Sequence, residues 1–156
     1  MLQKLPSSVP KKRQRNYYSG KKKRHTLKTQ VVVNKATAEI VCIHTANGKS
    51  HDFRIFKESK TYVNPKVVVV VDSGYQGLQK THANTMLPKK KTKKKTLTQE
   101  DKKHNNNLAS SRVLNENVIG VVKRFRILAE KYRNRKKRFN LRFNLIAGIY
   151  NFELNL

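Results

Sequence analysis

The stretch VVVVVDSGYQG, from Val67 to Gly77, decides the predicted fold. Five consecutive valines are apolar on both faces, a pattern typical of a central strand that helices cover on both sides. In open sheets, ligands and catalytic groups gather at the carboxyl ends of such strands, and Asp72 stands at that end. Gly74 and Gly77 let the backbone turn away sharply, which would leave the carboxylate presented. The alternative is that Asp72 only caps the turn or the helix that follows.

Two extended runs lie upstream of the valines. TLKTQVVVN (26–34) and ATAEIVCIHTA (36–46) are rich in β-branched residues and predict neighbouring strands. Asn47-Gly48, after the second run, is a strong tight-turn signal. HDFRIFKES (51–59) predicts one or two helical turns with apolar side chains facing inward.

Downstream of the valines, the sequence predicts helices. Thr98-Gln99-Glu100-Asp101 has the Thr-x-x-acid form of a capping box, which opens a helix. That helix is expected to break at the three asparagines 105–107 and to resume from about 108 to 132. The last segment, FNLRFNLIAGIYNFEL, places five residues at the spacing of a core-facing helical stripe: Phe139, Phe143, Ile146, Ala147 and Tyr150. We therefore expect an α/β fold.

The charge of the chain restricts its partners. With 36 Lys and Arg against 9 Asp and Glu, the 156 residues carry a net charge of +27, so a polyanion is the natural partner. No window approaches the roughly 18 apolar residues of a spanning helix, and the first residues show no run resembling a signal peptide. We expect a cytoplasmic protein that does not use a membrane. Cys42 is expected to be a buried thiol, and the five scattered histidines give no zinc spacing.

The basic residues fall in three blocks, at 10–28, 88–103 and 123–142. Each block by itself is explained equally well as a solvated surface. Three blocks in a short chain with 9 acids favour contact with nucleic-acid phosphates instead. The middle block is nearly of low complexity and is expected to be a mobile loop.

A second candidate carboxylate, Glu116, lies within the predicted helix. Arg112, Glu116 and Lys123 are four and seven positions apart, and hence share one helical face. The alternative is an ordinary ion pair on a solvated helix. Gly120 costs a helix interior about 1 kcal/mol, which hints at a close contact one turn after Glu116, although a helix–helix contact would serve equally well.

Three segments together resemble a known family: YYSGKKKRHTLK (17–28), DSGYQG (72–77) and ENVIGVVKRFRILAEKYRNRKKRFNLRFNLIAGIYNFEL (116–154). They are similar to the C-terminal catalytic part of bacterial insertion-sequence transposases of the DDE class, in the branch related to Harbinger nucleases. The resemblance implies a ribonuclease-H-like mixed sheet with flanking helices. It also implies that two aspartates and one glutamate hold divalent metal, with Asp72 in the second-aspartate role and Glu116 in the glutamate role.

The resemblance further implies DNA cleavage and strand transfer with two Mg²⁺ or Mn²⁺ ions. A signature of related transposases, Tyr-x2-Arg-x3-Glu-x6-Lys, is matched by Arg112, Glu116 and Lys123, with Ala109 at the tyrosine position. Lys123 would reach a phosphate near the metals, and Arg112 would orient Glu116 or bind the terminal DNA strand. Further DNA contacts are expected from five cations: Lys21, Lys22, Lys23, Arg24 and Arg124.

The first acid of the triad has no counterpart in this sequence. Residues 1–38 contain no Asp or Glu, and Asp52 lies after the second predicted strand, in a pre-helix position, where it is a poor substitute. We therefore expect an incomplete two-metal site and a chain that is inactive alone, as a truncated reading frame or the downstream half of a frameshifted product. The first strand of the sheet is expected to be missing, which would leave the strand at 26–34 with an unpaired edge.

The expected organisation is a basic arm with the start of the second core strand at 1–30, followed by a partial DDE transposase catalytic domain at 31–156. The expected partners are DNA, at transposon ends and target within the bacterial nucleoid, and a full-length transposase or further copies of this chain. Two other classes stay open: a basic RNA-binding or ribosome-associated protein, and a DNA-binding remnant that modulates an intact transposase. Only a nuclease should bind Mg²⁺ or Mn²⁺ less well when Asp72 or Glu116 is changed.

Overall fold

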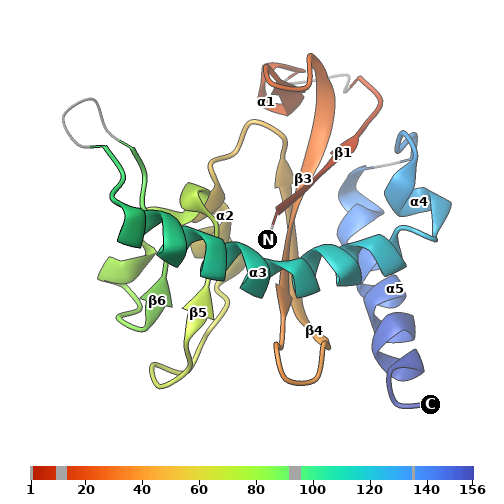
Figure 1. The fold of residues 1–156 in the computed structure, drawn as a ribbon. Coiled ribbons are helices and arrows are strands. Elements are labelled where there is room, and N and C mark those ends of the chain that lie inside the picture. The colour runs from red at the N-terminus through yellow and green to blue at the C-terminus, as the bar shows by residue number, and fades with distance from the viewer. Residues whose placement is uncertain (1, 10–13, 92–95, 135) are drawn as a thin grey trace.

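The main sheet is built around one long central strand. The structure, a computed structural model, describes residues 2–9, 14–91, 96–134 and 136–156. Strand β3 (Arg24–Val33) pairs antiparallel with three others (Figure 1): β1 (Leu2–Pro6), β2 (Tyr18–Ser19) and β4 (Ile40–Asn47). The predicted neighbouring strands are β3 and β4, and the chain turns after Asn47 as the Asn-Gly signal indicated. That part of the prediction is confirmed.

The expectation of an unpaired edge on β3 is wrong. β1 covers this edge in a register that runs from Leu2 opposite Gln30 to Pro6 opposite Thr26. The run LQKLP gave no strand signal because it is short and carries a lysine and a proline. Pro6 is tolerated because β1 is an edge strand, where a missing N–H costs no ladder bond on the open side. The domain boundary expected at residue 30 falls inside β3.

The valine run does not form a central strand, so that prediction is wrong. Only β5 (Val69–Val70) is a strand, and it pairs in parallel with β6 (Thr85–Met86) in a separate two-stranded sheet. Val67 and Val68 are 52% and 54% exposed. β-branched composition favours extended backbone but does not choose pairing partners, and the centre of the main sheet is occupied by β3. The described part of the chain is therefore mixed α and β, with two sheets rather than one.

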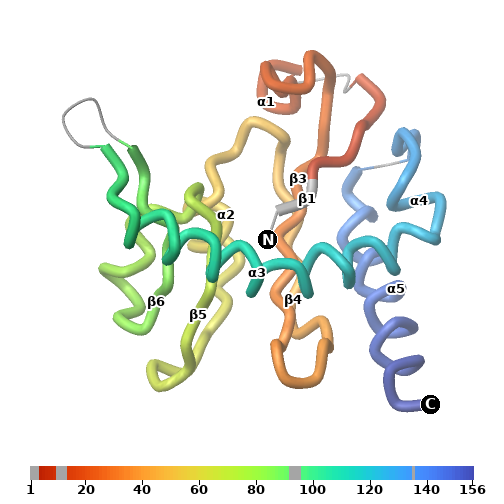
Figure 2. Tube along the Cα trace, viewed as in Figure 1, coloured from red at the N-terminus to blue at the C-terminus, as the bar shows by residue number. Residues whose placement is uncertain are grey.

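The long helix α3 (Gln99–Val122) crosses the molecule from β5 to α5, as the ribbon and the Cα trace both show (Figures 1 and 2). The predicted capping box at its start is confirmed, because the Thr98 side chain accepts a hydrogen bond from Asp101 N and Asp101 Oδ2 accepts one from Thr98 N. The predicted break at residues 105–107 and the predicted continuation to 132 are wrong. Burial of Leu108 directly after the asparagines favours a continuous helix over their weak intrinsic propensity.

Shorter elements complete the fold: the helices α1 (Gln14–Tyr17), α2 (Asp52–Ser59), α4 (Arg126–Ala129) and α5 (Phe139–Glu153), and the 3₁₀ turns η1 (Ser73–Tyr75), η2 (Leu78–Lys80) and η3 (Lys136–Arg138). In the described ranges, none of the helices has the length and apolar character needed to cross a bilayer. Cys42 is half-buried rather than buried, with its Sγ 3.3 Å from Thr61 Oγ1.

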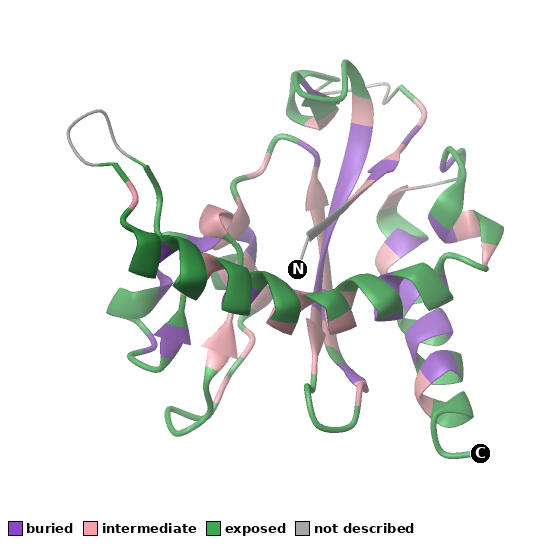
Figure 3. Ribbon diagram, in the orientation of Figure 1, coloured by how far each residue is buried: buried purple, intermediate pink, exposed green. Residues whose placement is uncertain are grey.

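Two apolar clusters hold these elements together, and Figure 3 shows the buried stripes on β3 and α5. The larger cluster joins the main sheet to α4, α5 and the end of α3, and the five residues predicted to face the core from α5 are all buried. That prediction is confirmed. The smaller cluster consists of Val71, Tyr75 and Leu78, with Phe53 and Phe56 of α2 packed against it. It fixes the segment that carries Asp72.

Candidate functional site

Asp72 lies at the entrance of η1, two residues after β5. Its Oδ1 accepts a hydrogen bond from Ser73 N at 2.5 Å, so the carboxylate does cap the turn, as the alternative interpretation held. The side chain is nevertheless 50% exposed, which leaves it accessible from solvent. Gly77 has a φ of +100°, a conformation that glycine adopts without strain, and it lets the chain turn away as expected.

An ion pair joins this turn to α3. Arg112 Nη1 lies 3.1 Å from Asp72 Oδ1, with the two side chains 29% and 50% exposed. Pairs with this exposure contribute at most about 1 kcal/mol, so the contact positions the two groups more than it stabilises the fold. Arg112 Nε is buried and finds no hydrogen-bond acceptor among the described residues. Within the described part of the chain, this Nε–H is therefore an unsatisfied donor that is enclosed by the protein and not reached from solvent.

Glu116 lies one helical turn after Arg112 on α3, and its side chain is exposed. The structure thus brings Asp72 to the helix that carries Glu116. Gly120 does not mark a close contact, because a Cβ atom there would meet nothing within 4 Å. That hint from the sequence is wrong. Across the described residues, no three His, Cys, Asp or Glu side chains form a group able to hold a metal ion.

A second carboxylate supports the Asp72 turn from behind. Asp52, the first residue of α2, pairs with the buried Lys28 of β3. The Asp52 carboxylate occupies the space that a Cβ atom at Gly74 would need, so a larger residue there would force the Asp52 side chain to shift. The sequence analysis did not predict that the Lys28–Asp52 ion pair would support this turn. Its signal is Lys28 itself, a lysine inside a strand that is buried on both faces and therefore requires an acid partner.

Tyr75 links the same turn to the main sheet. Its hydroxyl donates to Gln30 Oε1 at 3.3 Å, and its ring lies in the smaller apolar cluster. Burial raises the pKa of Tyr75, and the negative charges of Asp52 and Asp72 raise it further. The hydroxyl is therefore a permanent hydrogen-bond donor at neutral pH.

The cations expected to contact DNA lie in two places. Lys21, Lys22, Lys23 and Arg24 are all exposed where β2 leads into β3. Lys123 and Arg124 follow the last turn of α3; Lys123 is exposed, whereas Arg124 pairs with Glu153 of α5. Lys123 is seven residues beyond Glu116, a rise of roughly 10 Å along α3.

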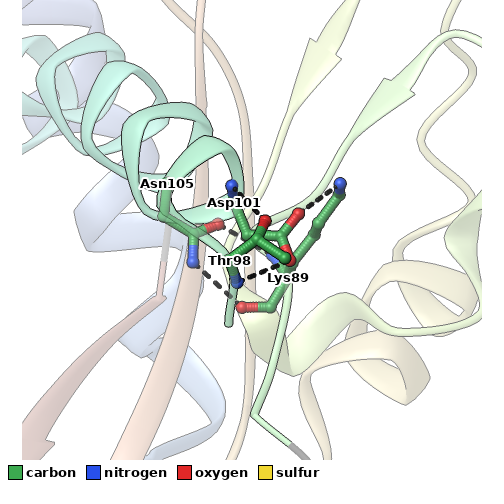
Figure 4. Close-up of polar contacts among 4 residues, drawn as sticks. All are labelled: Lys89, Thr98, Asp101 and Asn105. Atoms are coloured by element: carbon green, nitrogen blue, oxygen red, sulfur yellow. Dashed lines mark hydrogen bonds and ion pairs between the residues drawn. The ribbon is translucent and has the colours of Figure 1, made fainter. Parts of the chain in front are cut away.

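The first end of the middle basic block is anchored at Lys89 to the start of α3 (Figure 4), and its other end runs into that helix. Lys89 Nζ donates to Asp101 Oδ1 at 2.6 Å, and the Asn105 side chain bonds both the N and the O of Lys89, at 2.8 and 3.0 Å. The hydrogen bond from Lys89 holds the pKa of Asp101 below its usual value, and the same bond raises the pKa of Lys89. Residues 92–95, within the segment expected to be mobile, lie outside the described residues.

The donor chemistry of Asp72 and Glu116 suits a hard cation such as Mg²⁺ or Mn²⁺, which takes oxygen ligands and retains several waters. The number of carboxylate ligands is smaller than the three that a DDE site uses. The described residues supply these two carboxylates on adjoining elements, and no third acid joins them. Asp52 does not complete the set, because its carboxylate is engaged by Lys28 behind Gly74.

Comparison with known proteins identifies the class. The model of the DDE superfamily endonucleases matches residues 4–151, and the chain belongs to this family. A probable transposase for insertion sequence element IS702 from Microchaete diplosiphon is 46% identical over 151 residues, which cover 97% of this chain and 55% of that protein. The chain thus spans about half the length of this relative. No solved structure matches the chain.

Proposed function

We propose that the chain is a catalytic part of an insertion-sequence transposase, which acts on DNA by metal-dependent phosphodiester cleavage and strand transfer. The observation that carries the proposal is the Arg112–Asp72 ion pair, because it joins the turn after β5 to the helix that carries Glu116. Membership of the DDE endonucleases supports it. A ribonuclease-H-like arrangement of the catalytic core is part of the same proposal.

In this proposal Asp72 and Glu116 are the metal ligands. Bound Mg²⁺ or Mn²⁺ would activate the attacking oxygen and stabilise the leaving one. Arg112 holds the Asp72 carboxylate toward α3 through their ion pair. Lys123, exposed at the end of the helix, contacts the phosphate backbone further along the same strand.

We further propose that the 156-residue chain does not cleave DNA by itself. Residues 1–38 contain no Asp or Glu, and two carboxylates leave a two-metal site without one ligand. The net charge of +27 also lowers the local concentration of cations. The missing acid would come from another chain or from a segment joined ahead of β1.

The test is Mg²⁺-dependent nicking of DNA that carries the ends of the element. We expect no nicking by the 156-residue chain, and nicking by a version extended ahead of Leu2 with a strand that carries an aspartate. In the extended version, Asp72→Asn and Glu116→Gln should each abolish the activity, whereas Glu58→Gln, in the exposed pair with Arg54, should not. An unextended chain that nicks as well as the extended one would contradict the proposal.

A second candidate is a nucleic-acid-binding protein without catalysis, either a DNA-binding remnant or an RNA- or ribosome-associated protein. The lack of a third acid beside Asp72 and Glu116 among the described residues favours it. It predicts that Asp72→Asn and Glu116→Gln leave both metal binding and nucleic-acid binding unchanged.

A further inference from the structure

A cationic cavity lies beside the main sheet, between β1, the β2–β3 turn and the loop that joins β4 to α2. Its volume is about 320 Å³, and its lining includes four lysines and one acid: Lys4, Lys21, Lys28, Lys49 and Asp52. The lysines come from separate parts of the chain, so the fold, and not one basic run, brings them together. We call this cavity the lysine pocket.

The charges in the lysine pocket are not balanced. Among the described residues, Asp52 is the only acid in its lining, and Lys28 engages it while donating to Ser50 O at 2.8 Å. Lys4, Lys21 and Lys49 have no acid partner among the described residues, and Lys4 Nζ reaches only Ser19 Oγ, at 3.5 Å. Burial lowers the pKa of Lys4, the charge of Lys28 lowers it further, and the charge of Asp52 partly offsets these effects. An anion in the pocket would relieve this repulsion.

The backbone around the lysine pocket is fixed by hydrogen bonds. Gly48 N donates to Thr26 O at 3.0 Å, and Lys49 N donates to Asn16 O at 3.1 Å. The turn that carries Lys21 is closed by the bond from Lys22 N to Ser19 O, at 3.2 Å. The lysine stems therefore start from ordered positions, which reduces the entropy lost when they bind an anion.

The lysine pocket adjoins the Asp72 turn. Asp52 lines the pocket and also occupies the space next to Gly74, two residues after Asp72. The pocket and the Asp72 turn are therefore linked through this one side chain. A basic pocket beside a cleavage site holds the strand through charge and carries no sequence information.

We infer that the lysine pocket binds a backbone phosphate of the DNA strand that passes Asp72. The inference rests on the proposed function, since it takes DNA as the ligand, but it concerns binding and not cleavage. The same lysines would also attract free phosphate. Binding of a duplex and of inorganic phosphate must therefore be compared, in the absence of divalent metal.

The first measurement is an NMR titration of the folded 156-residue chain with a short DNA duplex and, separately, with inorganic phosphate. The amide signals of Gly20, Gly48 and Ser50, which line the pocket, should shift with the duplex at concentrations well below those needed with phosphate. Shifts by phosphate at equal or lower concentration would overturn the assignment to a DNA strand. A duplex that leaves all three signals unmoved would overturn the site.

The second measurement compares matched lysine variants by fluorescence anisotropy with the same duplex. Lys49→Gln should weaken binding several-fold and reduce the slope of log affinity against log salt by about 1. Lys35→Gln, an exposed lysine in the turn between β3 and β4, is the control and should bind like the unmodified chain. Equal effects of the two substitutions would overturn the inference. Because no metal is present, failure of the proposed cleavage site would leave both results unchanged.

Discussion

At the scale of single residues, glycines divide into those that the fold requires and those that it does not. A Cβ atom at Gly74 would overlap the Asp52 carboxylate, whereas a Cβ atom at Gly120 would meet nothing within 4 Å. We expect Gly74→Ala to lower the free energy of unfolding by about 1–3 kcal/mol, as overpacking does elsewhere. Gly120→Ala, in the interior of α3, should raise it by about 0.5–1 kcal/mol.

Urea unfolding of both variants checks this pair of effects. The opposite signs make the comparison informative, because both changes add a single methyl group. If Gly74→Ala were as stable as the unmodified chain, the Asp52 carboxylate would not lie against position 74. The claim that Asp52 supports the Asp72 turn would then be contradicted.

The hydrogen-bonded ion pair of Lys89 and Asp101, which we call the clamp, predicts how the stability of the fold depends on pH. The hydrogen bond from Lys89 lowers the pKa of Asp101 from its ordinary value of 3.8. Because the folded pKa lies below the unfolded one, the stability gained is fully present above the unfolded pKa and is lost as pH falls through the folded pKa. We expect the carboxyl ¹³C signal of Asp101 to titrate below 3.8, and Lys89→Met to move the midpoint back toward that value. An unchanged midpoint in Lys89→Met would show that the clamp does not form in solution.

At the scale of elements, α5 is the helix on which the larger cluster depends. Phe143 is fully buried in this cluster, whereas Leu145 on the same helix is 62% exposed. We expect Phe143→Ala to cost about 3–5 kcal/mol of the free energy of unfolding, through lost burial and the cavity left behind. Leu145→Ala should change it by less than about 0.5 kcal/mol. Chemical denaturation that gave similar losses for both would contradict the orientation of α5.

Elements with a strong local signal were predictable from the sequence. The periodic stripe on α5, the capping box at Thr98 and the β-branched runs of β3 and β4 each determine their own structure. The prediction for the valine run was wrong because its position in a sheet depends on which strand it pairs with, and the local sequence does not determine that choice. β1 was not predicted for the same reason, since the run LQKLP forms a strand through its pairing with β3.

The candidate site shows the same division between local and distant information. Asp72 and Arg112 could be selected from the sequence, but their contact across 40 positions could be seen only in the fold. The Lys28–Asp52 pair and the lysine pocket were not predicted, because each joins residues from separate elements. Local sequence patterns therefore identify the candidate side chains, and the tertiary structure determines which of them are in contact.

At the scale of the whole molecule, the chain combines a strongly basic surface with few carboxylates. The net charge of +27 favours binding to a polyanion and opposes binding of a cation, so we expect the proposed metal site to depend on both Asp72 and Glu116. The two residues lie on separate elements that the Arg112–Asp72 ion pair joins. The central claim is that these two carboxylates hold the same metal ion.

Paramagnetic broadening by Mn²⁺ tests this claim most directly, because it needs no enzymatic activity. We expect the amide signals of Ser73 and Asn117, next to the two carboxylates, to broaden together at Mn²⁺ concentrations that leave Glu58 in α2 sharp. Asp72→Asn and Glu116→Gln should each reduce the broadening at both positions. Broadening at only one of the two, or broadening near Glu116 that persists undiminished in Asp72→Asn, would contradict a shared metal site.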